Sequence, residues 1–324
     1  MRLVPFWFIV ITVLWTGFFV LEGFDFGVGM LHGIIGKDEA GRRAAINTIG
    51  PLWDGNEVWL IVAGASMFAA FPGWYATMFS GFYLALVLLL VALIVRGVSF
   101  EYRGKGKAAR WLRTWDAALT AGSLAAPLLI GVALGDLLHG ATFLSLKTTG
   151  DMRERAGHLA RRVAPVTAVA VLAFISWTHA SAGKGALLNP IEFTAVLAAF
   201  AAVWLAYEHR EGWAFTMTTV TMAACIISIF TDLYPRVMVS STNAAYDLTV
   251  HNTASGAYSL KVMTVVAVIF LPFVLAYQTW TYYVFRRRIS QQEFQPPPQS
   301  TPAGAPGPSA ASPQAGAPPA SQAN

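Results

Sequence analysis

The sequence predicts an all-α protein that crosses a membrane several times. Hydrophobic residues make up 56% of the 324 residues and charged residues only 12%, whereas charged residues are about a quarter of a typical soluble domain. The apolar residues are gathered in runs close to the length of about 20 residues that a helix needs to cross a bilayer. The first run is too long and too acidic for a cleaved signal peptide, so we expect it to be retained as a span.

These runs predict about eight transmembrane helices followed by a disordered tail. Pro72 and Gly73 are expected to form the tight turn between the second and third spans, and Pro127 to kink the fourth. From about Gln291 onward the chain is dominated by Pro, Ala, Ser, Gly and Gln, and such a segment cannot bury enough apolar surface to fold. The predicted spans lie near 6–32, 50–70, 74–96, 116–139, 163–180, 190–207, 213–233 and 260–285.

The basic residues follow membrane topology and do not indicate nucleic-acid binding, although the net charge is +5. They cluster in short loops beside the spans, as the positive-inside rule describes. The loops after the first and third spans should therefore be cytoplasmic, with the N-terminus outside. The basic residues assigned to these loops are Lys37, Arg42 and Arg43, and then Arg96, Arg103, Lys105, Lys107, Arg110 and Arg113.

The segment 140–162 conflicts with this topology. A fourth span at 116–139 would place it outside, yet the segment is strongly basic, which predicts a cytoplasmic position. The charges therefore require one more crossing between about Leu134 and Lys147 than the hydropathy supplies. The basic residues of the segment are Lys147, Arg153, Arg155, Arg161 and Arg162.

Four parts of the chain are predicted from these patterns. A first helical bundle at 1–139 carries acidic motifs, and a basic loop follows at 140–162. A second helical bundle occupies 163–290, and the disordered tail is 291–324. Cys225 is the only cysteine, which excludes an intramolecular disulfide and a multi-cysteine metal site.

Two acidic pairs in consecutive spans are the strongest functional signal. Asp54 and Glu57 lie at the start of the second span, and Glu22 and Asp25 lie inside the first. An ionisable group at membrane depth is costly, so it is a candidate for charge or proton transfer. The competing interpretations are that Asp54 stabilises the first turn of its helix and that Asp25 only makes structural hydrogen bonds.

The acidic pairs belong to a longer series of motifs. The sequence reads GFDFGVGM at 23–30, WDGNEVWL at 53–60, FAAFP at 68–72, FSGFY at 79–83 and FEYR at 100–103. In this order and spacing the series resembles subunit II of the cytochrome bd-type quinol oxidases. The resemblance is dense over about 1–140 and continues more loosely from GATFL at 140–144 through the remaining helical region.

The resemblance implies a fold of two four-helix bundles plus one peripheral helix, in a bacterial cell membrane. It implies a larger partner, subunit I, that holds haems b558, b595 and d. The complex would oxidise quinol and reduce dioxygen to water with protons from the cytoplasm, and this chain would have no independent activity. Small single-span subunits, lipid and quinone are further expected partners.

The chain departs from the family pattern in one place. In the family, a segment resembling GVALGDLL at 131–138 is followed by an external loop and the start of a fifth helix, which a segment resembling HGATF at 139–143 closes. Here the two segments are adjacent. Our hypothesis is that 140–162 stays cytoplasmic and that the region around 134–147 is strained or re-entrant.

The resemblance also implies roles for individual residues. It assigns Asp54 to the proton route from the cytoplasm, and Glu57, one turn further on, could relay the proton or pair with a basic residue. It places Glu101 and Lys105 at the cytoplasmic entrance of a proton path, although a solvated loop is an equal alternative. Trp53 could pack against subunit I or be an interfacial aromatic residue.

Small residues surround Asp25 in the first span. Gly23, Gly27 and Gly29 let another helix approach closely, so we expect an interface there. Asp116 is expected to cap the fourth helix. We predict no haem ligand and no metal site in this chain, because the histidines are scattered near span ends and loops.

Two other classes of function are compatible with hydropathy alone. A secondary transporter coupled to protons or cations could use carboxylates at broken helices, and an assembly subunit would need no chemistry. The ordered motif series favours the oxidase subunit. Co-purification of a haem-bearing partner would discriminate between them, since neither alternative predicts it.

Overall fold

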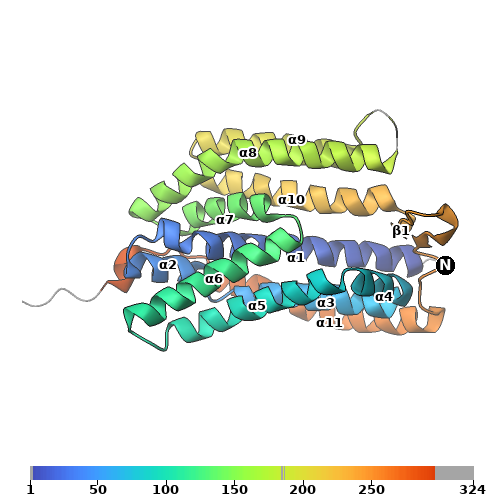
Figure 1. The fold of residues 1–324 in the computed structure, drawn as a ribbon, viewed down its shortest axis with the longest axis horizontal. Helices are drawn as coiled ribbons and strands as arrows, with labels where there is room; N and C mark the ends of the chain where they lie inside the picture. Colours follow the sequence, from blue (N-terminus) through green and yellow to red (C-terminus); the bar gives the residue numbers. More distant parts are fainter. Residues whose placement is uncertain (1–2, 184, 186, 296–324) are drawn as a thin grey trace, which may run out of the picture. The chain divides into compact units, whose positions relative to one another are not determined.

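A computed structural model describes residues 3–183, 185 and 187–295, and it is almost entirely helical (Figure 1). The predicted all-α class is confirmed. The predicted disordered tail lies outside the described residues from 296 onward. Its first residues are ordered, because Gln291–Phe294 forms a 3₁₀ helix (η2) whose Gln291 amide donates to both oxygens of Asp38 at 2.7 and 2.8 Å. The α-helices are α1 (Leu3–Ile35), α2 (Glu39–Ile49), α3 (Trp53–Ala70), α4 (Pro72–Gly81), α5 (Tyr83–Arg103), α6 (Ala109–Leu129), α7 (Ala133–Lys147), α8 (Gly150–Ala182), α9 (Pro190–Tyr207), α10 (Glu211–Leu233) and α11 (Ala257–Val284).

Six helices in the described part of the chain are long and apolar enough to cross a membrane: α1, α5, α8, α9, α10 and α11. This agrees with the predicted multi-pass membrane protein. The second predicted span corresponds to α3, which carries the Asp54 and Glu57 pair. A small hairpin of β1 (Arg236–Met238) and β2 (Leu248–Thr249), with the 3₁₀ helix η1 (Ala244–Tyr246) between them, connects α10 to α11.

The first helix is the centre of the structure, because α1 packs against α3, α6, α7 and α10. Close approach to α7 depends on two glycines that face each other. A Cβ atom at Gly27 would overlap the carbonyl oxygen of Asp136 and the backbone of Gly140, and a Cβ at Gly140 would overlap Gly27. Helices that approach this closely need small residues at the contact, and α1 and α7 meet at Gly27 and Gly140.

The third predicted span differs from the structure. The chain breaks at Phe82, between α4 and α5, and α5 then continues as helix to Arg103. Arg96 and Arg103 were assigned to the following loop, but they lie in α5 and their side chains are buried. The reason is that both guanidinium groups form ion pairs with carboxylates on neighbouring helices. These ion pairs offset the cost of removing the positive charges from water.

The fourth predicted span is also wrong as a continuous helix, because α6 ends at Leu129 and the chain reverses direction. Gly131 has a φ of +81°, a left-handed conformation that glycine adopts without a Cβ clash. Pro127 lies in the last turn of α6, and its carbonyl accepts from Val132 at 2.9 Å to close the reversal. After this turn α7 runs back toward the end at which α6 begins (Figure 1). The chain thus turns back within the bundle beside the segment 134–147, for which a strained or re-entrant region was hypothesised.

The segment 140–162 is not a loop. It is divided between α7 and α8, with only Thr148 and Thr149 between them. Lys147 is buried at the end of α7 and donates to the carbonyls of Phe285 and Arg287. The two-bundle boundary predicted at 139 therefore falls within α7, and Met1–Phe294 forms one compact unit.

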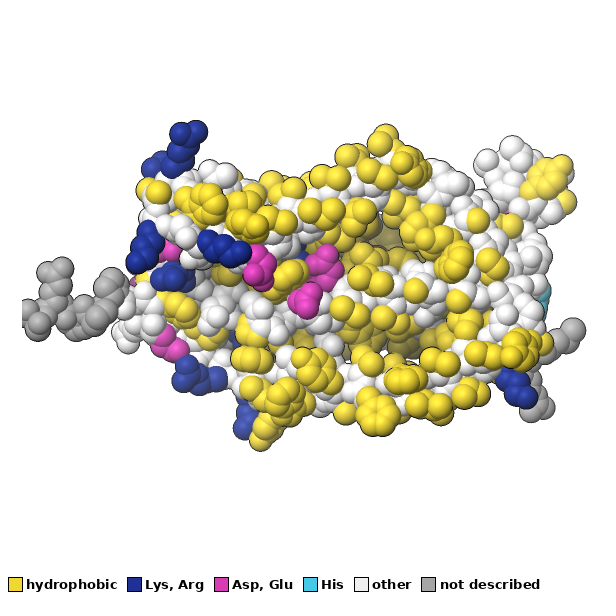
Figure 2. Space-filling model, turned by 90° about the horizontal axis from the view of Figure 1, so that it is seen from below, with side chains coloured by type: hydrophobic (Ala, Val, Ile, Leu, Met, Phe, Trp, Pro, Cys, Tyr) yellow, Lys and Arg dark blue, Asp and Glu magenta, His cyan; other side chains and the backbone are white. Residues whose placement is uncertain are grey.

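One end of the helices collects the basic residues, and we call it the basic end. It is held together by contacts between distant segments: Glu39 with Arg103, Lys147 with Phe285, and Arg153 with Glu211. Figure 2 shows most of the visible Lys and Arg side chains at this end, and a broad apolar surface beyond them. This arrangement matches a protein that crosses a bilayer with its basic loops on one side.

Candidate functional site

A buried arginine lies among three carboxyl groups in the part of the bundle nearer the basic end. Arg96 is completely buried, and its Nη1 lies 2.6 Å from Oε1 of Glu22 and 3.5 Å from Oε2 of Glu57. Its guanidinium carbon is 4.9 Å from the ring centroid of Phe26 and 5.2 Å from that of Phe100. The site therefore places one cation of α5 between acids of α1 and α3, in an aromatic surrounding that favours a cation.

Asp25 belongs to the same site through a second polar group, Asn56. The Asn56 amide nitrogen donates to Oδ2 of Asp25 at 2.7 Å, and the Asn56 amide oxygen accepts from Gln278 at 3.0 Å and from the Tyr282 hydroxyl at 2.8 Å. Asp25 is fully buried, and its Oδ1 has no hydrogen-bond partner among the described residues. The structural and the proton-transfer interpretations of Asp25 are thus both compatible with its contacts.

Asp54 and Glu57 lie at different depths on α3. Asp54 is exposed in the first turn, where the N-cap is Leu52 and no side chain caps the helix. Within the described residues Asp54 has no hydrogen bond or ion pair. Glu57 is half-buried and pairs with Arg96. The acids therefore run from an exposed group at the helix start to fully buried groups on α1.

The other predicted residues lie away from this cluster. Glu101 and Lys105 are exposed, and the Lys105 ammonium lies 4.2 Å from the ring centroid of Tyr102. Trp53 stacks on Phe100 with ring centroids 4.9 Å apart and an interplanar angle of 13°. Trp53 thus packs within the chain at this position.

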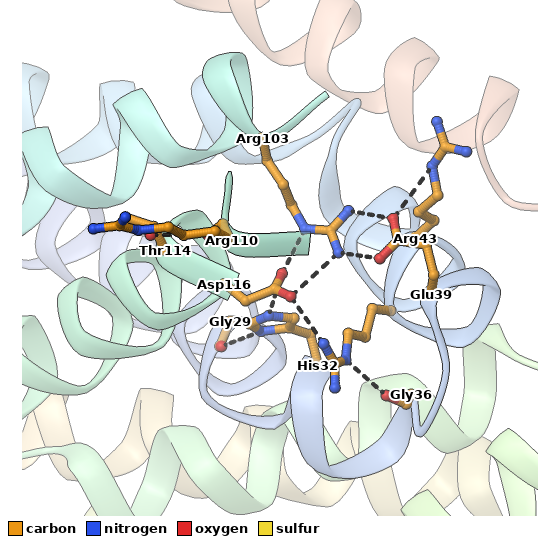
Figure 3. Close-up of polar contacts among 10 residues, drawn as sticks. Gly29, His32, Gly36, Glu39, Arg43, Arg103, Arg110, Thr114 and Asp116 are labelled. Atoms are coloured by element: carbon orange, nitrogen blue, oxygen red, sulfur yellow. Dashed lines mark hydrogen bonds and ion pairs between the residues drawn. The ribbon is translucent and has the colours of Figure 1, made fainter. Parts of the chain in front are cut away.

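A second polar cluster ties four helices together at the basic end (Figure 3). Asp116 accepts from Arg103 Nε at 2.5 Å and from Arg42 at 3.2 Å, and it lies 3.3 Å from Nε2 of His32. Arg103 also donates to both oxygens of Glu39, at 3.1 and 3.0 Å. Asp116 does not cap its helix as expected, because α6 already begins at Ala109. It joins α6 to α1, α2 and α5.

Sequence reasoning missed Arg96, Arg103 and Asn56. The signal for Arg96 was its position inside an apolar run that continues to Val98, which places the arginine in a helix and not in a loop. The signal for Asn56 was its position between Asp54 and Glu57 in the same motif. The partners on α11, Gln278 and Tyr282, had no sequence signal, because they are more than 200 residues away from Asn56.

Comparison with known proteins decides the family. The family profile described as cytochrome bd terminal oxidase subunit II matches residues 3–140 and 136–285. The chain is 42% identical to cytochrome bd ubiquinol oxidase subunit 2 of Bacillus subtilis, over 89% of this chain and 97% of that protein. The chain belongs to the cytochrome bd terminal oxidase subunit II family.

Two further relatives of this subunit II are more distant. The cytochrome bd-I ubiquinol oxidase subunit 2 of Escherichia coli K12 is 33% identical, over 89% of this chain and 96% of the relative. The probable cytochrome oxidase subunit 2 of Haemophilus influenzae is 34% identical, over 85% of this chain and 92% of the relative. The resemblance inferred from the motifs is thus confirmed, and the designation subunit II implies a partner subunit I.

The comparisons also bear on the shortened middle of this subunit. The family profile matches in two segments that meet at 136–140. The alignment to the Escherichia coli relative extends over 362 residues although only 89% of this 324-residue chain takes part. That relative therefore has residues that this chain lacks, and the two matched segments meet within α7, just after the reversal.

The oxidase family implies haem in the complex, and the two fully buried histidines of this chain, His32 and His139, are both engaged in other contacts. Of the buried histidines, His32 has Nδ1 2.8 Å from Gly29 O and Nε2 3.3 Å from Asp116. His139 has Nδ1 2.7 Å from the Thr218 hydroxyl and Nε2 3.2 Å from Val20 O. Both nitrogens of each ring already have a partner, so neither ring offers one to iron.

Proposed function

We propose that this chain is the non-haem subunit of a membrane-bound quinol:oxygen oxidoreductase and supplies part of its cytoplasmic proton route. Its partner subunit I would hold haems b558, b595 and d and reduce dioxygen to water during aerobic respiration. The observation that carries the proposal is the series of acids that leads from exposed Asp54 through Glu57 to the buried Glu22 and Asp25 beside Arg96.

Charge balance supports proton transfer through these acids. Glu22, Asp25 and Glu57 surround one guanidinium, that of Arg96. An uncompensated charge in a low-dielectric interior is costly, so a buried excess of carboxylates favours binding of a proton. A carboxyl group that binds a proton in this way can pass it to a neighbouring acceptor.

In the proposed route, Asp54 accepts a proton at the surface and Glu57 transfers it inward. Arg96 would position Glu57 and Glu22, and Asn56 would orient Asp25 through its amide. Glu101 would collect protons at the entrance of the route and Lys105 would hold a negative charge or water there, since both side chains are exposed at the basic end. Trp53, Gly23, Gly27 and Gly29 would hold the helices that carry these acids.

We further propose that subunit I binds the face formed by α3 and α11. Along most of its length α11 is exposed, with large side chains such as Phe270, Phe273 and Trp280 more than half accessible. Exposed apolar surface of this size marks either lipid contact or a partner. The inner end of the proposed route lies next to this face, because Asn56, the partner of Asp25, is hydrogen-bonded to Gln278 and Tyr282 of α11.

The substrate in this proposal is ubiquinol or menaquinol, and small single-span subunits, lipid and quinone complete the complex. The proposal is tested by affinity purification of this chain from its native membrane, followed by a reduced-minus-oxidised spectrum. We expect a co-purified subunit with combined b- and d-type haem signals. Recovery of the folded chain with no haem partner would contradict the oxidase proposal and would favour a transporter.

The variant Asp54→Asn tests the proton role within the assembled complex. The amide keeps the shape of the side chain but cannot carry a proton, so we expect lower quinol-driven oxygen consumption per haem with normal assembly. Asp151→Asn is the matched control, because Asp151 is also an exposed acid in the first turn of a helix. Equal turnover of the two variants would remove Asp54 from the route.

A further inference from the structure

An apolar cavity of about 550 Å³ lies beside the turn between α6 and α7. Its walls come from this turn and from α1, α4, α8, α9 and α10. Side chains that define the walls include Trp15, Trp74, Val171, Ala199 and Cys225. The cavity is open at one side, where Leu128 and Phe174, which are 59% and 38% exposed, belong to its lining.

The reversal of the chain at Gly131 creates this cavity. Ser123 of α6 lies at Gly29 of α1, and Asp136 of α7 lies at Gly23. The turn between them therefore reaches only to about the middle of α1, whereas α8 and α10 continue beyond it (Figure 1). Beyond the turn, neither α6 nor α7 lines the part of α1 farther from the basic end, and the alignment to the Escherichia coli relative includes residues that this chain lacks.

The lining of the cavity selects an apolar occupant. No charged side chain lines it in the described part of the chain. Three of its threonine hydroxyls donate to carbonyls of the chain, from Thr167 to Leu134, from Thr218 to Phe215 and from Thr221 to Met217. Ordered water needs two to four polar partners, and apolar cavities stay dry. A polar headgroup would find no charged partner here.

The cavity extends through only part of the length of the bundle, which favours a lipid tail as its occupant over a transmembrane helix from another protein. On the side of the basic end the space is filled by α7, which packs against α1, α8 and α10. A foreign transmembrane helix has to cross the whole hydrocarbon core of about 30 Å, and α7 blocks that path. A tail of one leaflet reaches only to about the middle of a bilayer, and α7 begins close to the middle of α1, near Gly23.

We propose that an acyl chain of a phospholipid from the leaflet opposite the basic end occupies this cavity. The tail enters between Leu128 and Phe174 from the lipid-facing surface and fills the space beside the turn between α6 and α7. It packs on the small residues Ala170, Ala199 and Ala202. The chain thus completes its own bundle with lipid, and this does not depend on the proton role proposed above.

The test uses the whole oxidase complex in nanodiscs of phosphatidylethanolamine and phosphatidylglycerol that contain a phospholipid with a diazirine in its acyl chain. After irradiation, we expect peptide mapping to find adducts on the cavity wall at Cys225 and Ile226, besides adducts on exposed α11. Ala199→Phe fills the cavity and should abolish the adducts at Cys225 and Ile226 while those on α11 persist. Ala173→Phe, on the exposed face of α8, should leave both sets unchanged.

Ala170→Phe replaces Ala199→Phe if the latter fails to assemble, since Ala170 lines the cavity from another helix. Adducts confined to exposed faces in the parent complex would overturn the proposal. Adducts at Cys225 that persist in a cavity-filled variant would also overturn it. Native mass spectrometry of the parent should find retained phospholipid, and a retained quinone without phospholipid would refute the assignment.

Discussion

The cluster around Arg96 and the cluster around Asp116 use the same residue types in opposite ways. At Arg96, one guanidinium faces three carboxyl groups, and oxygens of Glu22 and Asp25 lack hydrogen-bond partners among the described residues. At Asp116, both carboxylate oxygens have partners, and the two arginines, Arg42 and Arg103, balance the two acids, Asp116 and Glu39. A satisfied cluster rigidifies a fold, whereas an excess of buried acid favours proton exchange. The difference separates a structural tie from a proposed proton site.

The largest effect is expected from Arg96→Met, which removes the guanidinium that pairs with Glu22 and Glu57. Breaking a buried ion pair leaves an uncompensated charge and costs about 3–5 kcal/mol. We expect the complex to lose most of its assembled yield, measured as haem-bearing complex per unit of membrane. Arg110→Met, at an exposed position of α6, is the control. Normal assembly of Arg96→Met would show that the acids do not need the guanidinium.

Asp25→Asn is expected to lower turnover without preventing assembly. The asparagine oxygen can still accept from Asn56, but the side chain no longer exchanges a proton. General acid–base groups contribute about 100-fold or more to rates that depend on them, so a decrease of about tenfold or more in oxygen consumption per haem is expected. Unchanged turnover in assembled complex would assign Asp25 a purely structural role.

Asp116→Asn tests whether the cluster around Asp116 is structural and takes no part in proton transfer. The amide loses charge-assisted hydrogen bonds to Arg103 and Arg42, each of which contributes about 1.5–3 kcal/mol. We expect a lower melting temperature of the complex but the same oxygen consumption per assembled haem. A loss of turnover at full assembly would place Asp116 in the proton route and remove the distinction between the two clusters.

The smallest effect is expected from Trp53→Phe, because a phenylalanine ring can keep the stack on Phe100. Aromatic pairs contribute about 0.5–1.5 kcal/mol beyond burial, and most of this should be retained. Thermal unfolding and subunit I retention should both stay close to those of the parent. Loss of subunit I from this variant would show that the indole contacts the partner directly.

Local pattern was sufficient to predict the long apolar helices and the acidic motifs. The runs that became α1, α5 and α8 through α11 are apolar over enough residues to cross a bilayer in any context. Charge counting pointed to the region between Leu134 and Lys147, where the two segments matched by the family profile also meet. The assignment of Arg96 and Arg103 to a loop was wrong, because both lie in α5. Hydropathy scores an arginine as polar wherever it occurs, and it does not include a carboxylate on another helix that could pair with it.

The sequence by itself determined the class of protein, the family and the position of the carboxylates, since these depend on composition and on motifs within a few turns. Only the tertiary structure decided which acids meet Arg96, that α11 supplies Gln278 and Tyr282, and that the chain reverses at Gly131. The physical reason is that buried charges and cavities are properties of several helices at once. Their energies arise from contacts between residues far apart in the chain, which no local pattern specifies.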